Sequence, residues 1–106
     1  AMDCAMGKRT TATLVVEECL KKNMRAEMIY TGQTGWMQGN KYGFIFDSTL
    51  NDFVSGALEH SIMTCWNEEK PDLILLEGQS SLRNPSGPCG REFIISGNAK
   101  QIVLIH

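Results

Sequence analysis

The chain has 106 residues, a formal net charge of −2 and 42% hydrophobic residues, which predicts one folded domain and excludes a disordered chain. A net charge of this sign provides no basic surface for neutralising phosphates, so nucleic-acid binding is not expected. The apolar runs are far shorter than the roughly 18 residues that a membrane-spanning helix needs, so no membrane span is expected either.

Four cysteines are spread widely along the chain and form no CxxC pair or Cys/His cluster. This spacing predicts neither a zinc site nor a redox motif. The N-terminus lacks a charged segment followed by an apolar one, so no secretion signal is expected. Reduced thiols and a cytoplasmic location follow as the expectation.

Apolar residues at helical spacing predict a helix over residues 8–22, followed by a strand over 25–31 that leads into the Gly-rich sequence TGQTG at 31–35. The stretch over 36–49 mixes aromatic residues with Gly and Asn, and we expect it to be irregular, with a short strand at 44–46. A second apolar stripe predicts a helix over 49–68.

The run Leu-Ile-Leu-Leu at 73–76 is typical of a parallel strand that is covered on both faces, and Glu77 follows its end. Ser, Gly and Pro are frequent over 79–97, which predicts a loop, and a last buried strand is expected at 101–105. Strands that alternate with helices predict a parallel sheet, in which ligands bind at the carboxyl ends of the strands. We expect Lys8, Gln33, Glu77 and Gln79 at that edge.

Gly7 and Lys8 open the first predicted helix and are typical of a phosphate-binding loop, in which backbone N–H groups and one Lys hold the phosphates. The usual pattern is G-x-x-x-x-G-K-[ST]. Its first Gly is absent here, and Arg9 stands where a hydroxyl normally binds Mg²⁺, so Thr10 or Thr11 would replace that hydroxyl. A surface Lys in the first turn of an ordinary helix is the competing interpretation.

Carboxylates are the second part of a phosphate site, because Mg²⁺ usually takes one or two of them together with water and phosphate. Glu77, at the end of the buried strand, is the first candidate; a capping role is its alternative. Asp3, Asp47 and Asp52 are further candidates. For Asp52, capping of the second helix is an equal alternative, because Thr49 and Asp52 resemble a capping pair.

Four aromatic residues lie close together in the sequence and would either stack on a base, contact another domain or pack in the core, which is their commoner role. They are Trp36, Tyr42, Phe44 and Phe46.

Four motifs in this order, DCAMGKRTT, TGQTG, DFVSGALE and PDLILLEGQSSL, resemble the phosphate-loop (P-loop) domain of the domain-of-unknown-function family 1611, which is similar to dethiobiotin synthetase. The resemblance implies an α/β fold: a three-layer, P-loop NTPase-like parallel sheet. It also implies that residues 1–106 form a single partial domain, without the first strand and the C-terminal part. Ala1 and Met2 stand where the family has Gly-Thr, and Asn84 where a His is common.

The resemblance also implies a function: binding of ATP and Mg²⁺, with transfer of a phosphoryl or acyl group to a small carboxylate or amine substrate. Lys8 and Glu77 would be the catalytic residues. The nucleotide would be bound by Gly7, Lys8, Arg9, Thr10, Thr11, Gln33 and Gln79. The metal would be bound by Thr10, Asp3, Asp52 and Glu77.

Two alternatives stay open. Some family members are assigned as acetyl-CoA-dependent N-acetyltransferases of D-glutamate, and a loop that holds a diphosphate would serve CoA as well. A non-catalytic structural or assembly module is the other alternative, with exposed apolar edges driving association. The expected partners are an N-terminal domain of the same protein and further copies of the chain in a homo-oligomer.

Overall fold

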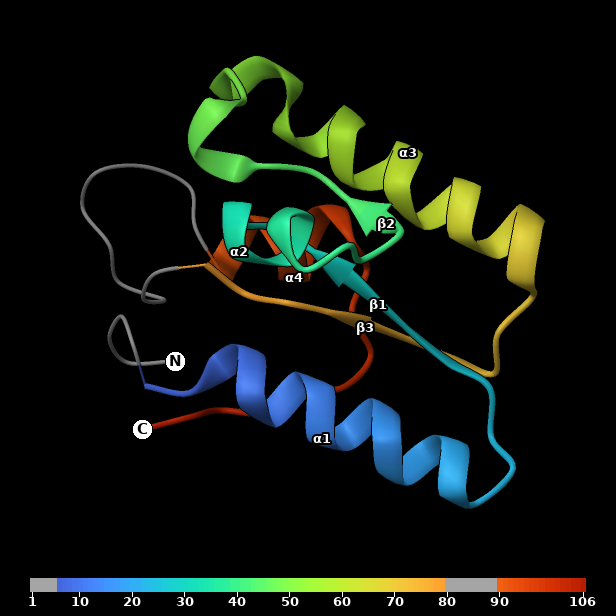
Figure 1. Ribbon diagram of the computed structural model, residues 1–106. Coiled ribbons are helices and arrows are strands. Elements are labelled where there is room, and N and C mark those ends of the chain that lie inside the picture. The colour runs from blue at the N-terminus through green and yellow to red at the C-terminus, as the bar shows by residue number, and fades with distance from the viewer. Residues whose placement is uncertain (1–5, 80–89) are drawn as a thin grey trace.

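A computed structural model describes residues 6–79 and 90–106 of the chain (Figure 1). The strands are short and form one sheet, and the two longest helices flank this sheet. In chain order the elements are α1 (Lys8–Lys21), β1 (Ala26–Tyr30), α2 (Gln33–Met37), β2 (Tyr42–Gly43), the 3₁₀ turn η1 (Phe46–Ser48), α3 (Asn51–Glu69), β3 (Leu73–Leu76) and α4 (Gly90–Ser96).

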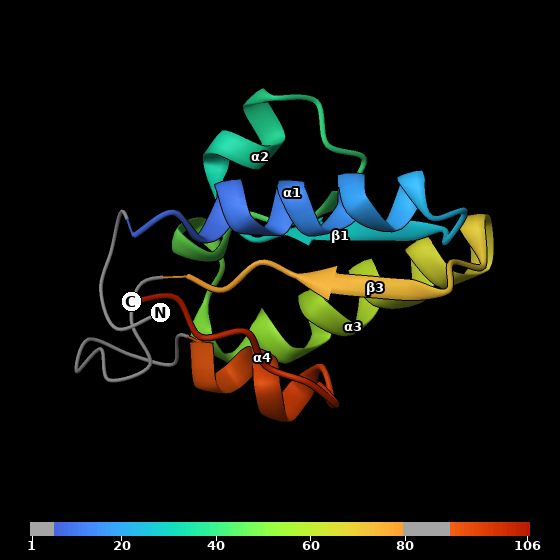
Figure 2. The same ribbon diagram turned by 90° about the horizontal axis from the view of Figure 1, so that it is seen from below.

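The three strands form a parallel sheet in the order β2-β1-β3. Helix α1 covers one face of the sheet and α3 covers the other, as Figure 1 shows. Helix α4 packs beside α3 (Figure 2). This arrangement confirms the predicted α/β fold with three layers, which arises because a sheet with two apolar faces needs a helical layer on each side.

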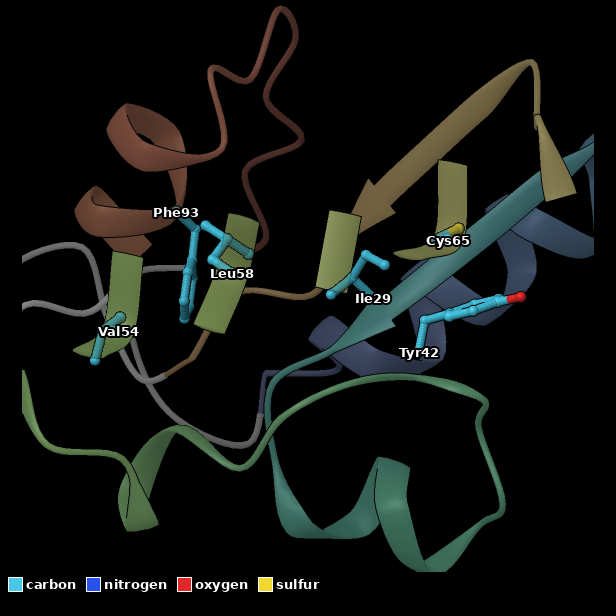
Figure 3. Packing of buried hydrophobic residues seen from close by; sticks show 6 residues of the cluster. All are labelled: Ile29, Tyr42, Val54, Leu58, Cys65 and Phe93. Atoms are coloured by element: carbon cyan, nitrogen blue, oxygen red, sulfur yellow. The ribbon is translucent and has the colours of Figure 1, made fainter. Parts of the chain in front are cut away.

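The core lies between the sheet and the layer formed by α3 and α4. Ile29 and Leu58 are fully buried there, and Phe93 of α4 reaches the same cluster (Figure 3). Phe44 and Phe46 pack on Phe93 with ring centroids 6.3 and 5.5 Å apart and edge-to-face geometry, an arrangement that the charge distribution of aromatic rings favours.

The core also accounts for three of the four aromatic residues singled out in the sequence. Tyr42 is buried, and Phe44 and Phe46 are partly buried against the cluster. Trp36 of α2 is 61% exposed. Core packing is therefore the role of three of these side chains, as their usual behaviour predicts, and Trp36 is the exception.

The parallel register brings the ends of the strands to one edge. Ile29 of β1 pairs with Leu76 of β3, and the amide of Glu77 donates to the carbonyl of Ile29 over 3.0 Å. At the other side of β1, Gly43 has φ +146°, and a Cβ there would lie 2.2 Å from the Tyr30 carbonyl oxygen. Only glycine fits this junction, and it lets β2 approach β1 at the edge where the site forms.

The helices predicted over 8–22 and 49–68 and the strands at 25–31 and 73–76 are confirmed within a few residues. The predicted strand at 44–46 is wrong: β2 lies two residues earlier, and η1 begins at Phe46. The TGQTG sequence is not only a loop, because α2 begins at Gln33. The predicted capping pair is wrong too, because Leu50 is the N-cap and makes no side-chain bond.

The C-terminal part differs most from the prediction. Helix α4 lies inside the segment expected to be a loop. Residues 101–105 form no strand and are mostly exposed, although Figure 2 shows them running in the same direction as β3. A largely apolar cavity of about 580 Å³ is lined by both β3 and these residues. No described residue pairs with this segment, and without a paired neighbour an apolar run does not become a strand.

None of the helices in the described part of the chain has the length and hydropathy that a membrane span requires. Cys19 and Cys65 are free thiols. Burial raises the pKa of the Cys65 thiol to about 11, so this cysteine is protonated at neutral pH and acts as an apolar core residue.

Candidate functional site

A polar cavity of about 480 Å³ lies at the carboxyl edge of the sheet. It is lined by segments that are far apart in the sequence: the start of α1, the turn after β1, η1 and the residues after β3. The lining residues are Met6, Gly7, Lys8, Arg9, Gly32, Gln33, Thr34, Asp47, Glu77 and Gln79. The structure therefore brings together the four residues that the sheet topology places at this edge.

The start of α1 provides the phosphate-loop geometry. Gly7 is the N-cap, with φ 90° and ψ 20°, and no side chain caps the first turn. A residue with a Cβ is strained in this left-handed conformation, so glycine suits the position. The backbone N–H groups of the first turn, together with the helix dipole, favour an anion here, and Lys8 lines the cavity beside them.

Glu77 supplies the acid of the site and is 6% exposed. Its carboxylate Oε2 accepts a hydrogen bond from Nη2 of Arg9 over 2.6 Å, and the same guanidinium donates through Nη1 to Oε1 of Gln38 over 2.9 Å. A buried carboxylate needs a cation close by, and Arg9 provides it. Arg9 thus joins α1, the end of α2 and the residue after β3.

A second chain of hydrogen bonds fixes the ends of β1 and β3. The fully buried Thr31 donates through Oγ1 to the carbonyl oxygen of Glu77 over 2.6 Å and accepts from Nε2 of Gln79 over 3.2 Å. A Cβ on Gly32 would lie 2.7 Å from Nε2 of Gln79. This close approach orients the Gln79 amide at the wall of the cavity.

Some predicted site residues lie elsewhere. Thr10 is exposed and is not among the residues that line the cavity, and Thr11 lines the apolar cavity beside β3 instead. Asp52 is exposed in the first turn of α3 and does not line the site. Asp3 lies outside the described residues. Asp47, a further candidate, does line the cavity.

Sequence reasoning missed the pairing of Arg9 with Glu77 and the contribution of Gln38 and Thr31. Arg9 carried one signal, since it occupies the motif position of a metal-binding hydroxyl. Gln38 carried none, because its place near Arg9 depends on how α2 packs. Thr31 carried no signal beyond its place in the TGQTG sequence.

The described residues do not fit the usual arrangement of Mg²⁺ at a phosphate loop. That arrangement needs a hydroxyl directly after the Lys and an acid that is available to the metal or its water. Here the first position is Arg9 and the acid is already paired with it. Residues 6–79 and 90–106 also contain no group of three or more His, Cys, Asp or Glu side chains placed to hold a metal ion.

Known proteins resemble this chain over nearly its whole length. The family model described as domain of unknown function (DUF1611_C) P-loop domain matches residues 2–106. The crystal structure of a DUF1611 family protein from Anabaena variabilis superposes with a TM-score of 0.78 at 30% sequence identity, over 89% of this chain and 26% of that protein. Among curated proteins none matches the sequence. The chain thus spans about a quarter of the length of the Anabaena protein.

Proposed function

This chain belongs to the DUF1611 family, as its C-terminal P-loop domain, and we propose that its polar cavity binds the phosphates of ATP. In this proposal the amides of residues 7–10 and the ammonium of Lys8 hold the phosphates, and the side chains of Gln33 and Gln79 donate further hydrogen bonds. The domain would serve an enzyme that transfers a phosphoryl or acyl group to a small carboxylate or amine substrate.

One observation carries the proposal: a left-handed glycine opens a 14-residue helix, and the next residue, Lys8, lines the same polar cavity as Glu77. Amides at a helix start attract a phosphate, and a Lys adds a full positive charge. Glu77 comes from the strand after a helical crossover, where α/β proteins place the groups that act on a ligand. Two segments that are far apart in the sequence, the start of α1 and the residue after β3, therefore converge on a volume suited to an anion.

Acetyl-CoA is the second candidate ligand, and the poor fit of the site to Mg²⁺ favours it, because phosphoryl transfer from ATP normally uses that metal. CoA carries an adenine nucleotide and a diphosphate, and a guanidinium binds a diphosphate by paired hydrogen bonds. A transfer of the acetyl group to an amine, as on D-glutamate, would then be the reaction. We also propose that the domain acts together with further domains of its own protein, since the chain spans 26% of the Anabaena protein. As a separate part of the proposal, the protein forms a homo-oligomer.

Calorimetric titration of the full-length protein with ATP, and separately with acetyl-CoA, tests the proposal. We expect the Lys8→Ala variant to bind about 10-fold to 100-fold more weakly, as expected for losing a charge-assisted hydrogen bond of about 1.5–3 kcal/mol. Lys22→Ala is the matched control, because Lys22 is exposed at the far end of α1. Its affinity should equal that of the wild type.

The outcomes separate the candidates. Loss of the acetyl-CoA signal alone in Lys8→Ala supports the acetyltransferase. Equal binding by wild type and Lys8→Ala contradicts the assignment of the loop. If the folded wild type binds neither compound, the non-catalytic assembly module replaces both candidates.

A further inference from the structure

We infer that Arg9 takes the place of Mg²⁺ at this site, so that the protein binds nucleotide phosphates without a metal ion. This inference rests on the proposed function, because it concerns how the same cavity receives its phosphates. It starts from two independent facts: Arg9 directly follows the Gly-Lys pair in the sequence, and its guanidinium lies 2.6 Å from the buried carboxylate of Glu77.

The electrostatics of the cavity require a cation between the acid and a bound phosphate. A phosphate beside the carboxylate of Glu77, which is 6% exposed, would be repelled, and repulsion between a buried charge and a ligand is stronger than in bulk water. In phosphate-loop proteins Mg²⁺ separates the two negative groups. Here the guanidinium already contacts Glu77 and lines the cavity, so the compensating charge is part of the chain.

The chemistry of the guanidinium suits this role. It carries a delocalised positive charge and has five N–H donors in a planar fork. The contacts with Glu77 and Gln38 engage one donor on each of its two terminal nitrogens. The group has further N–H donors, and a phosphate accepts paired hydrogen bonds from arginine. The Arg9 side chain is 19% exposed, so most of it contacts the protein while part of it remains accessible to a ligand.

The surrounding structure holds Arg9 in this position. Gly35 of α2 packs so closely that a Cβ there would lie 2.9 Å from Nη2 of Arg9 and 2.4 Å from Cβ of Tyr30. Gln38 ends the same helix and accepts from Nη1. Gly35 thus leaves space for the Arg9 guanidinium, and the amide of Gln38 accepts a hydrogen bond from it. These two contacts fix the orientation of the guanidinium before a ligand binds.

The test compares nucleotide affinity with and without metal. The full-length protein is titrated with ATP, and with acetyl-CoA, once in excess MgCl₂ and once in excess EDTA. We expect the affinity of the wild type for its ligand to differ by less than about threefold between the two buffers, which is below ~0.7 kcal/mol. An affinity that falls more than about tenfold in EDTA overturns the inference.

Arg9→Thr supplies the hydroxyl that the common motif has. We expect its affinity in EDTA to fall at least about tenfold and to recover in part when MgCl₂ is added. Arg9→Thr removes the guanidinium that pairs with the buried carboxylate of Glu77, so we expect this variant to be destabilised. The double variant Arg9→Thr with Glu77→Gln removes both charges. We expect thermal unfolding to show that this variant stays folded, and titration to show weak binding in both buffers.

Arg91→Thr is the matched control, because Arg91 is exposed on α4 and does not line the polar cavity. Its affinity should equal that of the wild type in both buffers. Wild-type binding that needs Mg²⁺ contradicts the role of Arg9 and leaves the proposed function intact. A wild type that binds no nucleotide in either buffer removes the proposed function, and the inference with it.

Discussion

The two ends of the sheet both carry ion pairs, yet they differ in what surrounds the charges. At the carboxyl edge, Arg9 and Glu77 form an ion pair beside a polar cavity, and the Glu77 side chain is 6% exposed. At the amino edge, Lys41 contacts Glu68 and Glu69 over 2.9 and 2.8 Å while 61% of its side chain is exposed. We call the group of Lys41, Tyr42, Glu68 and Glu69 the Lys41 cluster.

Burial, and not the number of charges, distinguishes these two regions. Exposed ion pairs contribute little to stability, because water solvates both partners and salt screens them. A buried carboxylate needs a cation close by. The start of α1, the end of α2 and the residue after β3 meet at the pair of Arg9 and Glu77. A dense cluster of surface charges is therefore a weak indication of function, whereas one buried pair beside a helix start and a cavity is a strong one.

The largest expected effect on the carboxyl edge comes from substitution of Gly35. A Cβ at this position would lie 2.4 Å from Cβ of Tyr30 and 2.9 Å from Nη2 of Arg9. We expect Gly35→Ala to destabilise the protein by about 1–3 kcal/mol, as overpacking does, and to weaken nucleotide binding through Arg9. Chemical denaturation measures the first effect and calorimetry the second.

Gly56 provides the matched control for Gly35. It also lies in a helix, but nothing would lie within 4 Å of an added Cβ. Gly56→Ala should therefore stabilise the protein by about 0.5–1 kcal/mol, since glycine is a poor helix former. Equal changes in the free energy of unfolding for the two variants would show that Gly35 is not tightly packed against the site.

A smaller effect is expected at Thr31, whose hydroxyl holds the ends of β1 and β3 together. Thr31→Val keeps the shape but leaves the Glu77 carbonyl and the Gln79 amide without this partner. We expect a loss of about 1–2 kcal/mol in the free energy of unfolding. Thr49→Val, which removes a partly buried bond to the carbonyl of Ile45 within one turn, should cost less.

Much of the fold could be predicted from the sequence because the main signals are local. The periodic apolar stripes of α1 and α3 and the run Leu73–Leu76 each specify an element from neighbouring residues alone. The position of the candidate site could also be predicted, because ligands bind at the carboxyl edge of a parallel sheet. The residues Lys8, Gln33, Glu77 and Gln79 needed no side-chain detail to be placed together.

The missed features depend on contacts between distant segments. Helix α4 has seven residues, and its buried Phe93 packs on Phe44 and Phe46, so tertiary packing selects a helix where composition favours a loop. Residues 101–105 have the composition of a strand but lack a paired neighbour among the described residues. The pairing of Arg9 with Glu77 joins residues 68 positions apart, and no local pattern encodes it.

The smallest expected effect tests the amino edge. Hydrogen bonds from Lys41 lower the pKa values of Glu68 and Glu69, and those of Glu69 and Tyr42 raise the pKa of Lys41. A carboxyl whose pKa is lowered by folding stabilises the folded protein at pH values above its pKa in the unfolded chain, about 4.5. This contribution is lost as the pH falls below that value. For Lys41 the stability is present below about pH 10.5 and is lost as the pH rises further.

We therefore expect the wild type to melt at a higher temperature than Lys41→Met, and this difference should be largest near neutral pH. It should shrink below about pH 4.5 as Glu68 and Glu69 are protonated. Thermal unfolding across this pH range measures it, with Lys22→Met as the control for loss of an exposed charge. Because Lys41 lies at the other end of the sheet, nucleotide affinity should stay at the wild-type value. A change in affinity would mean that the two ends are coupled, and burial alone would then no longer distinguish them.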